Sequence, residues 1–221
     1  GHGGADPGAV RAGLSEKALT LGFARALAAA LRAAGFDVTL TREADAFVAL
    51  GDRVARARAA GADLLISLHA DVVTEGDASG ASVYVLSEEA SDALAAALAR
   101  RENAADLFGG GAALDADLAR TLLSLVRRDT MTASRRLGES LVGALAERVP
   151  VLSGRPLRAA GFRVLKAPDT PSALVELGFL SNARDRARLV DPEWRAEAVA
   201  AIVAGVRAWS EAAPAPRRAA D

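Results

Sequence analysis

The stretch Leu64–Asp71, with the sequence LLISLHAD, carries four aliphatic residues in its first five positions and then a histidine, His69. A continuous apolar run of this length is typical of a strand buried on both faces of a parallel sheet, because a strand with one solvated face alternates apolar and polar residues. In open α/β sheets, ligands bind beyond the carboxyl ends of the strands. His69 and Asp71 therefore follow the strand at the place where a site is expected.

Strands and helices alternate on the N-terminal side of this run. Ser15–Ala34 is predicted to be a helix, because leucine or phenylalanine recurs every fourth residue, Ser15 is a suitable N-cap and Gly35 a suitable C′ residue. Phe36–Thr41 alternates in polarity and is predicted to be a strand. Val48–Ala60 is predicted to be a second helix, which Gly61 ends.

The C-terminal side continues the alternation after one helical interruption. In chain order we predict a strand at Ala81–Ser87, helices at Glu88–Asp106, Asp115–Arg128 and Asp129–Arg148, strands at Phe162–Lys166 and Ala173–Leu177, and a helix at Pro192–Ala212. The sequence thus predicts an α/β fold: a single three-layer α/β/α domain over residues 1–212, with a mostly parallel twisted sheet. Residues 88–130 form a helical insertion after the third strand, and 213–221 are expected to be a disordered tail.

Composition narrows the functional classes. With 221 residues, 51% of them hydrophobic and 25% charged, the chain can bury the core of one large domain. A net charge of −1 removes the broad positive field that non-specific nucleic-acid binding needs. The absence of cysteine excludes disulfides, thiolate zinc fingers, iron–sulfur clusters and a cysteine nucleophile. No apolar run approaches the roughly 20 residues of a membrane-spanning helix.

Both histidines of the chain stand where a ligand is plausible, although a structural role is the alternative for each. His69 ends the buried strand, and His2 lies in the glycine-rich stretch Gly1–Gly8, where missing side chains let the backbone approach a ligand. Two histidines without cysteine leave a zinc ion in need of a carboxylate, as in hydrolytic zinc sites with an open fourth position. Glu16 is the nearest candidate, although a carboxylate in a first helical turn also complements the helix dipole.

A second acidic residue, Glu176, stands in the apolar segment Ser172–Phe179. Burial of an unpaired charge is costly, so this carboxylate requires a partner, a raised pKa or a place at a cleft rim. Glu176 is a candidate general base; the alternative is a strand-end glutamate that faces solvent or pairs with Arg163 or Arg184. Phosphate binding by the glycine loop is disfavoured, because the Gly-Lys-Ser/Thr ending of a P-loop is missing.

Four motifs together resemble, in order and over nearly the whole chain, those of the zinc-dependent N-acetylmuramoyl-L-alanine amidases of bacterial cell walls. They are Gly1–Ala9 (GHGGADPGA), Arg42, Ser67–Asp71 (SLHAD) and Val175–Asn182 (VELGFLSN). Gly80–Ser87 and Glu102–Asp106 are similar to the cell-separation subgroup, which carries a helical insertion.

This resemblance implies the ligands and the reaction. His2, Glu16 and His69 would hold zinc (Zn2+), and Glu176 would be the catalytic glutamate. The substrate would be peptidoglycan, which consists of glycan and stem peptide. The bond that is cut would be the amide between N-acetylmuramic acid and the L-alanine of the stem peptide. The family's hydrophobic strand before the glycine loop is absent, so we expect a sheet without its first strand. A periplasmic or extracytoplasmic location is implied by the resemblance alone, since the sequence begins without a signal peptide.

The resemblance also implies regulation by the insertion at 88–130, which would cover the zinc site until a LytM-type activator domain binds. Glu102 is the first choice to occupy the open zinc position, with Asp106 four residues later on the same helix face. The alternative is that both acids are solvated and pair with Arg100 or Arg101.

Two further alternatives remain open from the sequence. A non-catalytic peptidoglycan-binding or regulatory module could retain the amidase fold; it would bind without stoichiometric zinc and release no stem peptide. Arg42 and Arg53 could meet substrate carboxylates or form salt bridges on the helix surface.

Overall fold

The computed structural model describes residues 1–73, 77–108 and 120–212. A four-stranded sheet lies at its centre, in the order β3-β6-β4-β5. The strands are β3 (Leu65–His69), β4 (Ser82–Leu86), β5 (Leu157–Ala160) and β6 (Ser172–Glu176). β3 pairs with β6 and β4 with β5 in parallel, whereas β4 and β6 are antiparallel. The predicted fold class, α/β with a mostly parallel sheet, is confirmed.

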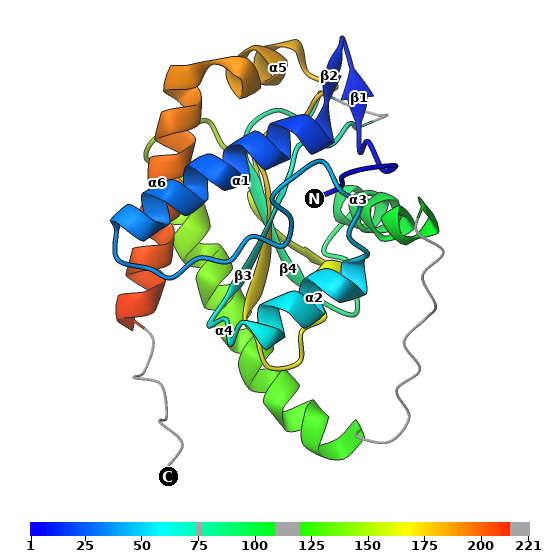
Figure 1. The fold of residues 1–221 in the computed structure, drawn as a ribbon, viewed down its shortest axis with the longest axis vertical. Helices are drawn as coiled ribbons and strands as arrows, with labels where there is room; N and C mark the ends of the chain where they lie inside the picture. The colour runs from blue at the N-terminus through cyan, green and yellow to red at the C-terminus, as the bar shows by residue number, and fades with distance from the viewer. Residues whose placement is uncertain (74–76, 109–119, 213–221) are drawn as a thin grey trace.

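Helices cover both faces of the sheet (Figure 1). One face carries α1 (Glu16–Ala33), α4 (Arg120–Ala146) and α6 (Pro192–Ala212), and the other carries α2 (Leu50–Ala59) and α3 (Ala93–Asn103). Alternation along the strands divides the core accordingly. Val83 and Val175 pack with α1, α4 and α6, while Tyr84 and Leu174 belong to the cluster on the side of α2 and α3. Among the described residues, no helix is long and apolar enough to cross a membrane.

Two predicted strands are wrong. Phe36–Thr41 is irregular, because no strand among residues 1–73, 77–108 and 120–212 pairs with its backbone. Phe162–Lys166 contains a short 3-10 turn, η2 (Arg163–Leu165). The apolar residues of this segment belong to the turn and are buried without being part of the sheet. The strand in this part of the chain is β5, which ends just before the segment.

The helical boundaries also differ from the prediction. The helix predicted at Glu88–Asp106 begins only at Ala93, because Asp92 caps it by accepting from the backbone N of Ala95 at 2.9 Å. It ends in the 3-10 helix η1 (Ala104–Phe108). The helices predicted at Asp115–Arg128 and Asp129–Arg148 are a single helix, α4, from Arg120 onward. Residues 109–119 and the predicted tail 213–221 lie outside the described residues.

Three short elements were not predicted. A small hairpin joins β1 (Val10–Arg11) to β2 (Leu14–Ser15) just before α1, and α5 (Ala183–Val190) follows β6. The strands have two residues each and α5 has eight, so each is shorter than the window over which a hydrophobic period can be recognised.

A buried carboxylate, Asp185 in α5, holds the loops around the sheet together. Its Oδ2 accepts from the backbone N of Gly80 at 2.9 Å and of Phe179 at 3.0 Å. Its Oδ1 accepts from the Ser79 hydroxyl at 2.8 Å and from Arg188 at 3.1 Å. One side chain therefore joins the entry to β4, the exit of β6 and the start of α5.

We predict that Asp185→Ala lowers the free energy of unfolding by about 2–4 kcal/mol, because it leaves two buried N–H groups without acceptors. Urea unfolding followed by circular dichroism measures the change. The exposed Asp129, changed in the same way, should cost no more than about 0.5 kcal/mol. Equal effects of the two substitutions would contradict this role of Asp185.

Candidate metal centre

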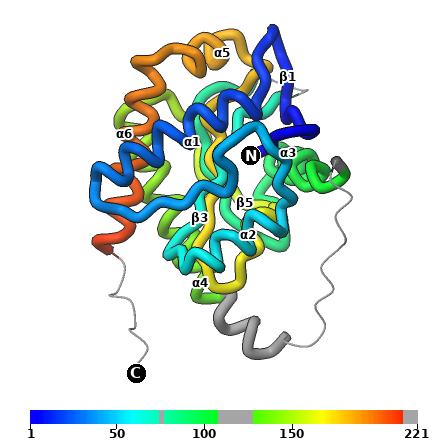
Figure 2. The backbone as a smooth tube through the Cα atoms, viewed as in Figure 1, coloured from blue at the N-terminus to red at the C-terminus, as the bar shows by residue number. Residues whose placement is uncertain are grey.

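Four side chains from separate parts of the chain converge beyond the carboxyl end of β3. They are His2 in the glycine loop, Glu16 at the start of α1, His69 at the end of β3 and Glu102 near the end of α3. All four are buried, and one potential ligand atom from each lies within 4.8 Å of the others. The N-terminal segment accordingly runs beside α3 (Figure 2).

The glycine loop turns sharply to present His2. His2 has a positive φ of 53°, and Gly3 follows at 135°. A Cβ atom at Gly3 would lie 2.2 Å from the carbonyl oxygen of Ala46, and one at Gly8 would lie 2.6 Å from Cδ2 of His2. Glycine is therefore required at both positions for the loop to pack against its neighbours.

Each histidine is oriented through one ring nitrogen. Nδ1 of His2 lies 2.7 Å from Oδ2 of Asp6, and Nε2 of His69 lies 2.9 Å from the hydroxyl of Ser67. The other ring nitrogens, Nε2 of His2 and Nδ1 of His69, point into the cluster. Such outer contacts fix the tautomer and the ring orientation of metal-binding histidines. The sequence analysis did not assign Asp6 and Ser67 a role in orienting the histidines. The signal that could have shown it is that each lies in the same motif as the histidine it contacts.

Glu16 is held by backbone donors on both oxygens. Its Oε1 accepts from the backbone N of Ala70 at 3.0 Å, and its Oε2 accepts from that of Ala9 at 2.8 Å. These bonds join α1 to the end of β3 and to the glycine loop, and they aim Oε1 at both histidines.

The separations suit a tetrahedral metal ion. Oε1 of Glu16 lies 3.2 Å from Nε2 of His2 and 3.0 Å from Nδ1 of His69; Oε2 of Glu102 lies 3.3 Å and 2.9 Å from the same atoms. Four ligands at the usual zinc distances of about 2.0–2.1 Å are separated by about 3.3 Å in a tetrahedron. Nε2 of His2 and Oε2 of Glu102 are buried and make no hydrogen bond. The donor set therefore fits zinc.

The electrostatics of the cluster also favour a cation. Burial alone disfavours the charged form of His2, but the charge of Glu16, the hydrogen bond to Asp6 and the nearby carboxylate of Glu102 outweigh it and raise the pKa of His2 to about 12. Burial likewise opposes ionisation of Glu102, yet His69 and His2 lower the pKa of Glu102 to about 2. In the absence of a metal, a proton on the imidazole supplies the positive charge that the carboxylates require.

Glu176 lies next to this cluster, since β6 pairs Glu176 with His69 of β3. It is completely buried; its Oε2 accepts from the backbone N of Asp71 at 3.1 Å, and its Oε1 has no hydrogen-bond partner. Burial, followed by the charges of Asp71 and Glu16, raises the pKa of Glu176 well above its usual range. Glu176 therefore does not face solvent, and among the described residues it forms no ion pair with Arg163 or Arg184, the two alternatives considered from the sequence.

The two acids of α3 and its following turn are separated. Glu102 lies in the cluster, whereas Oδ1 of Asp106 accepts from the backbone N of Leu50 at 2.9 Å and its Oδ2 lies 3.2 Å from Arg163. The reason is that α3 ends at Asn103, so the one-face relation expected of a continuous helix does not reach Asp106. Neither acid pairs with Arg100 or Arg101, and Arg101 instead pairs with Asp71 at 2.8 Å.

Two buried arginines support the glycine loop. Arg42 donates to the carbonyl oxygens of Gly1 at 3.1 Å and of Lys17 at 2.7 Å, and Arg53 donates to that of His2 at 2.8 Å. Both guanidinium groups therefore bind backbone carbonyls rather than forming the helix-surface salt bridges considered from the sequence.

The fold and the site define a mixed α/β domain with a buried two-histidine, two-glutamate group suited to a metal ion. The chain matches the family described as N-acetylmuramoyl-L-alanine amidase over residues 1–208, and it belongs to that family. It is 42% identical over 210 residues to N-acetylmuramoyl-L-alanine amidase AmiA of Escherichia coli, covering 93% of this chain and 72% of that protein. It is 39% identical to AmiC of Neisseria meningitidis, covering 94% of this chain and 50% of that protein.

Solved amidases have the same fold. N-acetylmuramoyl-L-alanine amidase AmiC2 of Nostoc punctiforme matches with a TM-score of 0.70 and 26% identity, over 96% of this chain and 93% of that one. An N-acetylmuramoyl-L-alanine amidase of Clostridium difficile matches with a TM-score of 0.70 and 20% identity, over 97% of this chain and 95% of that one.

We predict that zinc binding releases protons, because His2 is protonated at pH 7 when its pKa is raised to about 12 and must be neutral to bind a metal. Calorimetry in buffers of different ionisation enthalpy should show at least one proton released per zinc at pH 7. His2→Ala should release about one proton fewer and bind zinc more weakly. A binding heat that is independent of the buffer would contradict this protonation state.

Proposed function

We propose that this chain is a zinc-dependent peptidoglycan amidase that hydrolyses the amide between the lactyl carbonyl of N-acetylmuramic acid and the first L-alanine of the stem peptide. His2, Glu16 and His69 hold the zinc. The observation that carries the proposal is the convergence of these buried ligands beside the unpaired carboxylate oxygen of Glu176, in a chain of the amidase family. Its substrate implies a periplasmic or extracytoplasmic location.

When bound, zinc would supply Lewis-acid chemistry to the scissile carbonyl and to the attacking water. Glu176 acts as the general base, because its Oε1 is free to accept a proton from the attacking water and then to donate it to the leaving amine. The backbone N–H of Asp71 fixes the other oxygen of Glu176. A cation beside the carboxylate stabilises its charged form and so offsets the effect of burial on its pKa.

Residues 88–130 act as a regulatory segment within a catalytic domain that spans 1–212. Glu102 is 3% exposed, its Oε2 lies 2.9 Å from Nδ1 of His69, and it lines the cleft beside the cluster. The cleft left beside the cluster is only about 140 Å³. This arrangement supports an autoinhibited state in which Glu102 would be a ligand of the zinc together with His2, Glu16 and His69.

A second set of contacts, made by Arg101 and Asn103, holds α3 in place on either side of Glu102. Arg101 pairs with the buried Asp71 at 2.8 Å and donates to the carbonyl oxygen of Val72. On the other side, Asn103 donates to the carbonyl oxygen of Gly161 at 2.9 Å. Withdrawal of Glu102 must break these bonds, so an activator, which we propose to be a LytM-type domain, acts by binding the displaced helix more tightly.

We predict that Glu176→Gln lowers the rate of hydrolysis by about 100-fold or more while zinc content is unchanged, because the amide cannot accept the proton of the water. Release of stem peptide from purified sacculi and elemental analysis measure the two quantities. Glu139→Gln, on the surface of α4, is the matched control and should retain full activity. A zinc-loaded parent chain that binds sacculi without releasing stem peptide would favour a non-catalytic module.

We predict that Glu102→Ala raises basal hydrolysis at least about tenfold without loss of zinc, because the fourth position becomes accessible. Arg101→Ala should raise the basal rate by a smaller factor, since it removes only the ion pair with Asp71 and leaves Glu102 in the cluster. The exposed Arg100, changed to alanine, is the matched control and should leave the rate unchanged. Autoinhibition by this contact is rejected if Glu102→Ala retains zinc and folds but hydrolyses no faster than the parent.

A further inference from the structure

Asp71, two residues after His69, carries a carboxylate to which the proposed reaction gives no role. Asp71 is 1% exposed and lines the cleft beside the metal cluster. Its Oδ1 accepts from the backbone N of Val72 at 2.6 Å and lies 2.8 Å from a guanidinium nitrogen of Arg101. Its Oδ2 is buried and has no hydrogen-bond partner among the described residues. One half of this carboxylate is therefore free to accept a hydrogen bond.

Arg101 occupies a site built from two acceptors. Besides its ion pair with Asp71, the guanidinium group donates to the carbonyl oxygen of Val72. The backbone that carries these acceptors is fixed, since the backbone N of Leu180 donates to the carbonyl oxygen of Asp71 at 2.7 Å. A carboxylate and a carbonyl that share one cationic partner form a site suited to a positively charged group with several N–H donors.

The present occupant of this site belongs to the segment that must move. Arg101 and Glu102 are consecutive residues of α3, and both line the cleft together with Asp71. When Glu102 is withdrawn from the cluster, as the proposed function requires, Arg101 leaves Asp71 as well. The carboxylate and the carbonyl then lack the cation that satisfied them, so another cationic donor can take the same place.

The neighbouring Glu176 identifies that donor. The backbone N of Asp71 donates to Oε2 of Glu176 at 3.1 Å, so the two carboxylates belong to adjoining parts of one site. In the proposed hydrolysis, a C–O bond forms between water and the lactyl carbonyl, the C–N bond breaks, and the nitrogen receives the water proton through Glu176. The new carboxylic acid loses a proton and the released amine gains one, because an α-amino group has a pKa of about 7.7–8.0.

We propose that Asp71, together with the carbonyl oxygen of Val72, binds the α-amino group that hydrolysis creates on the L-alanine of the stem peptide. This inference rests on the proposed function, and Arg101 then occupies the place of that amino group while α3 covers the site. An ammonium group offers three N–H donors, which match the two oxygens of Asp71 and the carbonyl of Val72. Before the bond breaks, the carboxylate accepts from the scissile N–H and so holds the leaving nitrogen beside Glu176.

Binding of the cleavage product tests this site without hydrolysis. The protein is the full chain with Arg101→Ala and Glu102→Ala, called the open form, which lacks the competing guanidinium group. The probes are L-Ala-D-Glu and propionyl-D-Glu, which differ only in the amino group. In calorimetry, the amino group should strengthen binding at least about tenfold in the open form and less than about twofold once Asp71→Ala is added. An equal effect of the amino group in the two proteins overturns the proposal.

Two further variants of the open form separate this contact from a general loss of structure or charge. Asp71→Asn keeps the shape of the side chain and one acceptor oxygen but not the charge, so about a threefold preference for the amino group should remain. Asp129→Ala removes an exposed acid on α4 and should keep the full preference. The proposal is wrong if Asp71→Asn keeps the full preference, or if Asp129→Ala loses as much of it as Asp71→Ala.

Hydrolysis by the open form supplies an independent readout. The substrate is N-acetylmuramyl-L-Ala-D-Glu, compared with an analogue in which an ester oxygen replaces the scissile N–H. Asp71→Ala should lower kcat/KM at least about tenfold more for the amide than for the ester, because the ester has no N–H for Asp71 to bind. Equal losses for the two substrates contradict this role of Asp71.

The two experiments also separate this inference from the proposed function. An open form that prefers the amino group through Asp71 but hydrolyses neither substrate supports the amino-binding site and contradicts the proposed function. An open form that hydrolyses the amide but binds the two dipeptides equally overturns the amino-binding site and leaves the proposed function intact.

Discussion

The buried carboxylate of Glu16 is the contact on which the rest of the site depends. It accepts backbone hydrogen bonds from Ala9 and Ala70 and approaches both His2 and His69. The glycine loop, the start of α1 and the end of β3 are therefore fixed to one another by a single side chain. Because a buried carboxylate without partners is costly, these segments are held in the one arrangement that satisfies it.

The site also gathers several acidic groups. Two glutamates and the neighbouring Asp71 and Glu176 lie around two imidazoles, and among the described residues Arg101 is the arginine that forms an ion pair with one of these four acids, Asp71. Burial and the charges of Glu16 and Glu102 raise the pKa of Asp71 to about 8. A divalent cation would relieve this repulsion, so binding of metal and the ionisation of these acids are linked.

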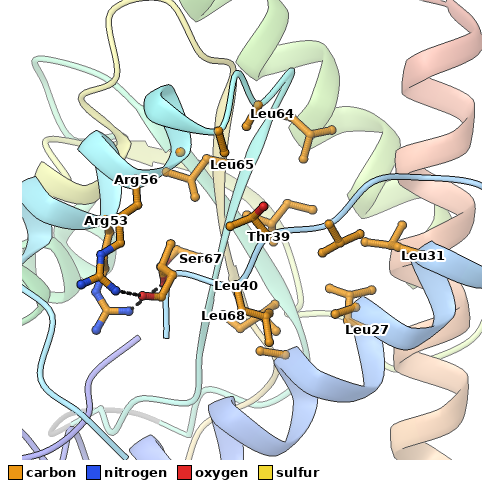
Figure 3. A pocket seen from close by; sticks show the side chains of 18 of the residues that line it. Leu27, Leu31, Thr39, Leu40, Arg53, Arg56, Leu64, Leu65, Ser67 and Leu68 are labelled. Atoms are coloured by element: carbon orange, nitrogen blue, oxygen red, sulfur yellow. Dashed lines mark hydrogen bonds between the residues drawn. The ribbon is translucent and has the colours of Figure 1, made fainter. Parts of the chain in front are cut away.

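A cavity of about 680 Å³, lined by residues of α1, α2, β3 and the segment 36–42, adjoins the metal cluster (Figure 3). Gly1 borders this cavity and its amino group donates to the carbonyl oxygen of Leu68, and the next residue, His2, enters the cluster. Arg42 and Arg53 hold the carbonyls of these two residues. The backbone at Gly1 and His2 is thus held both by β3 and by two guanidinium groups, which fixes the position of the His2 ring.

The sequence by itself determined the strand that ends at His69, the helix that begins near Glu16 and the order of the motifs, because continuous apolar runs and helical periodicity are local signals. Only the tertiary structure decided that Phe36–Thr41 is irregular, since pairing depends on a neighbouring strand that no local pattern reveals. The tertiary structure also decided that Glu102 and Asp106 lie in different places, Glu102 in the metal cluster and Asp106 beside Leu50. Their spacing would place them on one helix face, but the helix ends between them and each acid binds a different part of the fold.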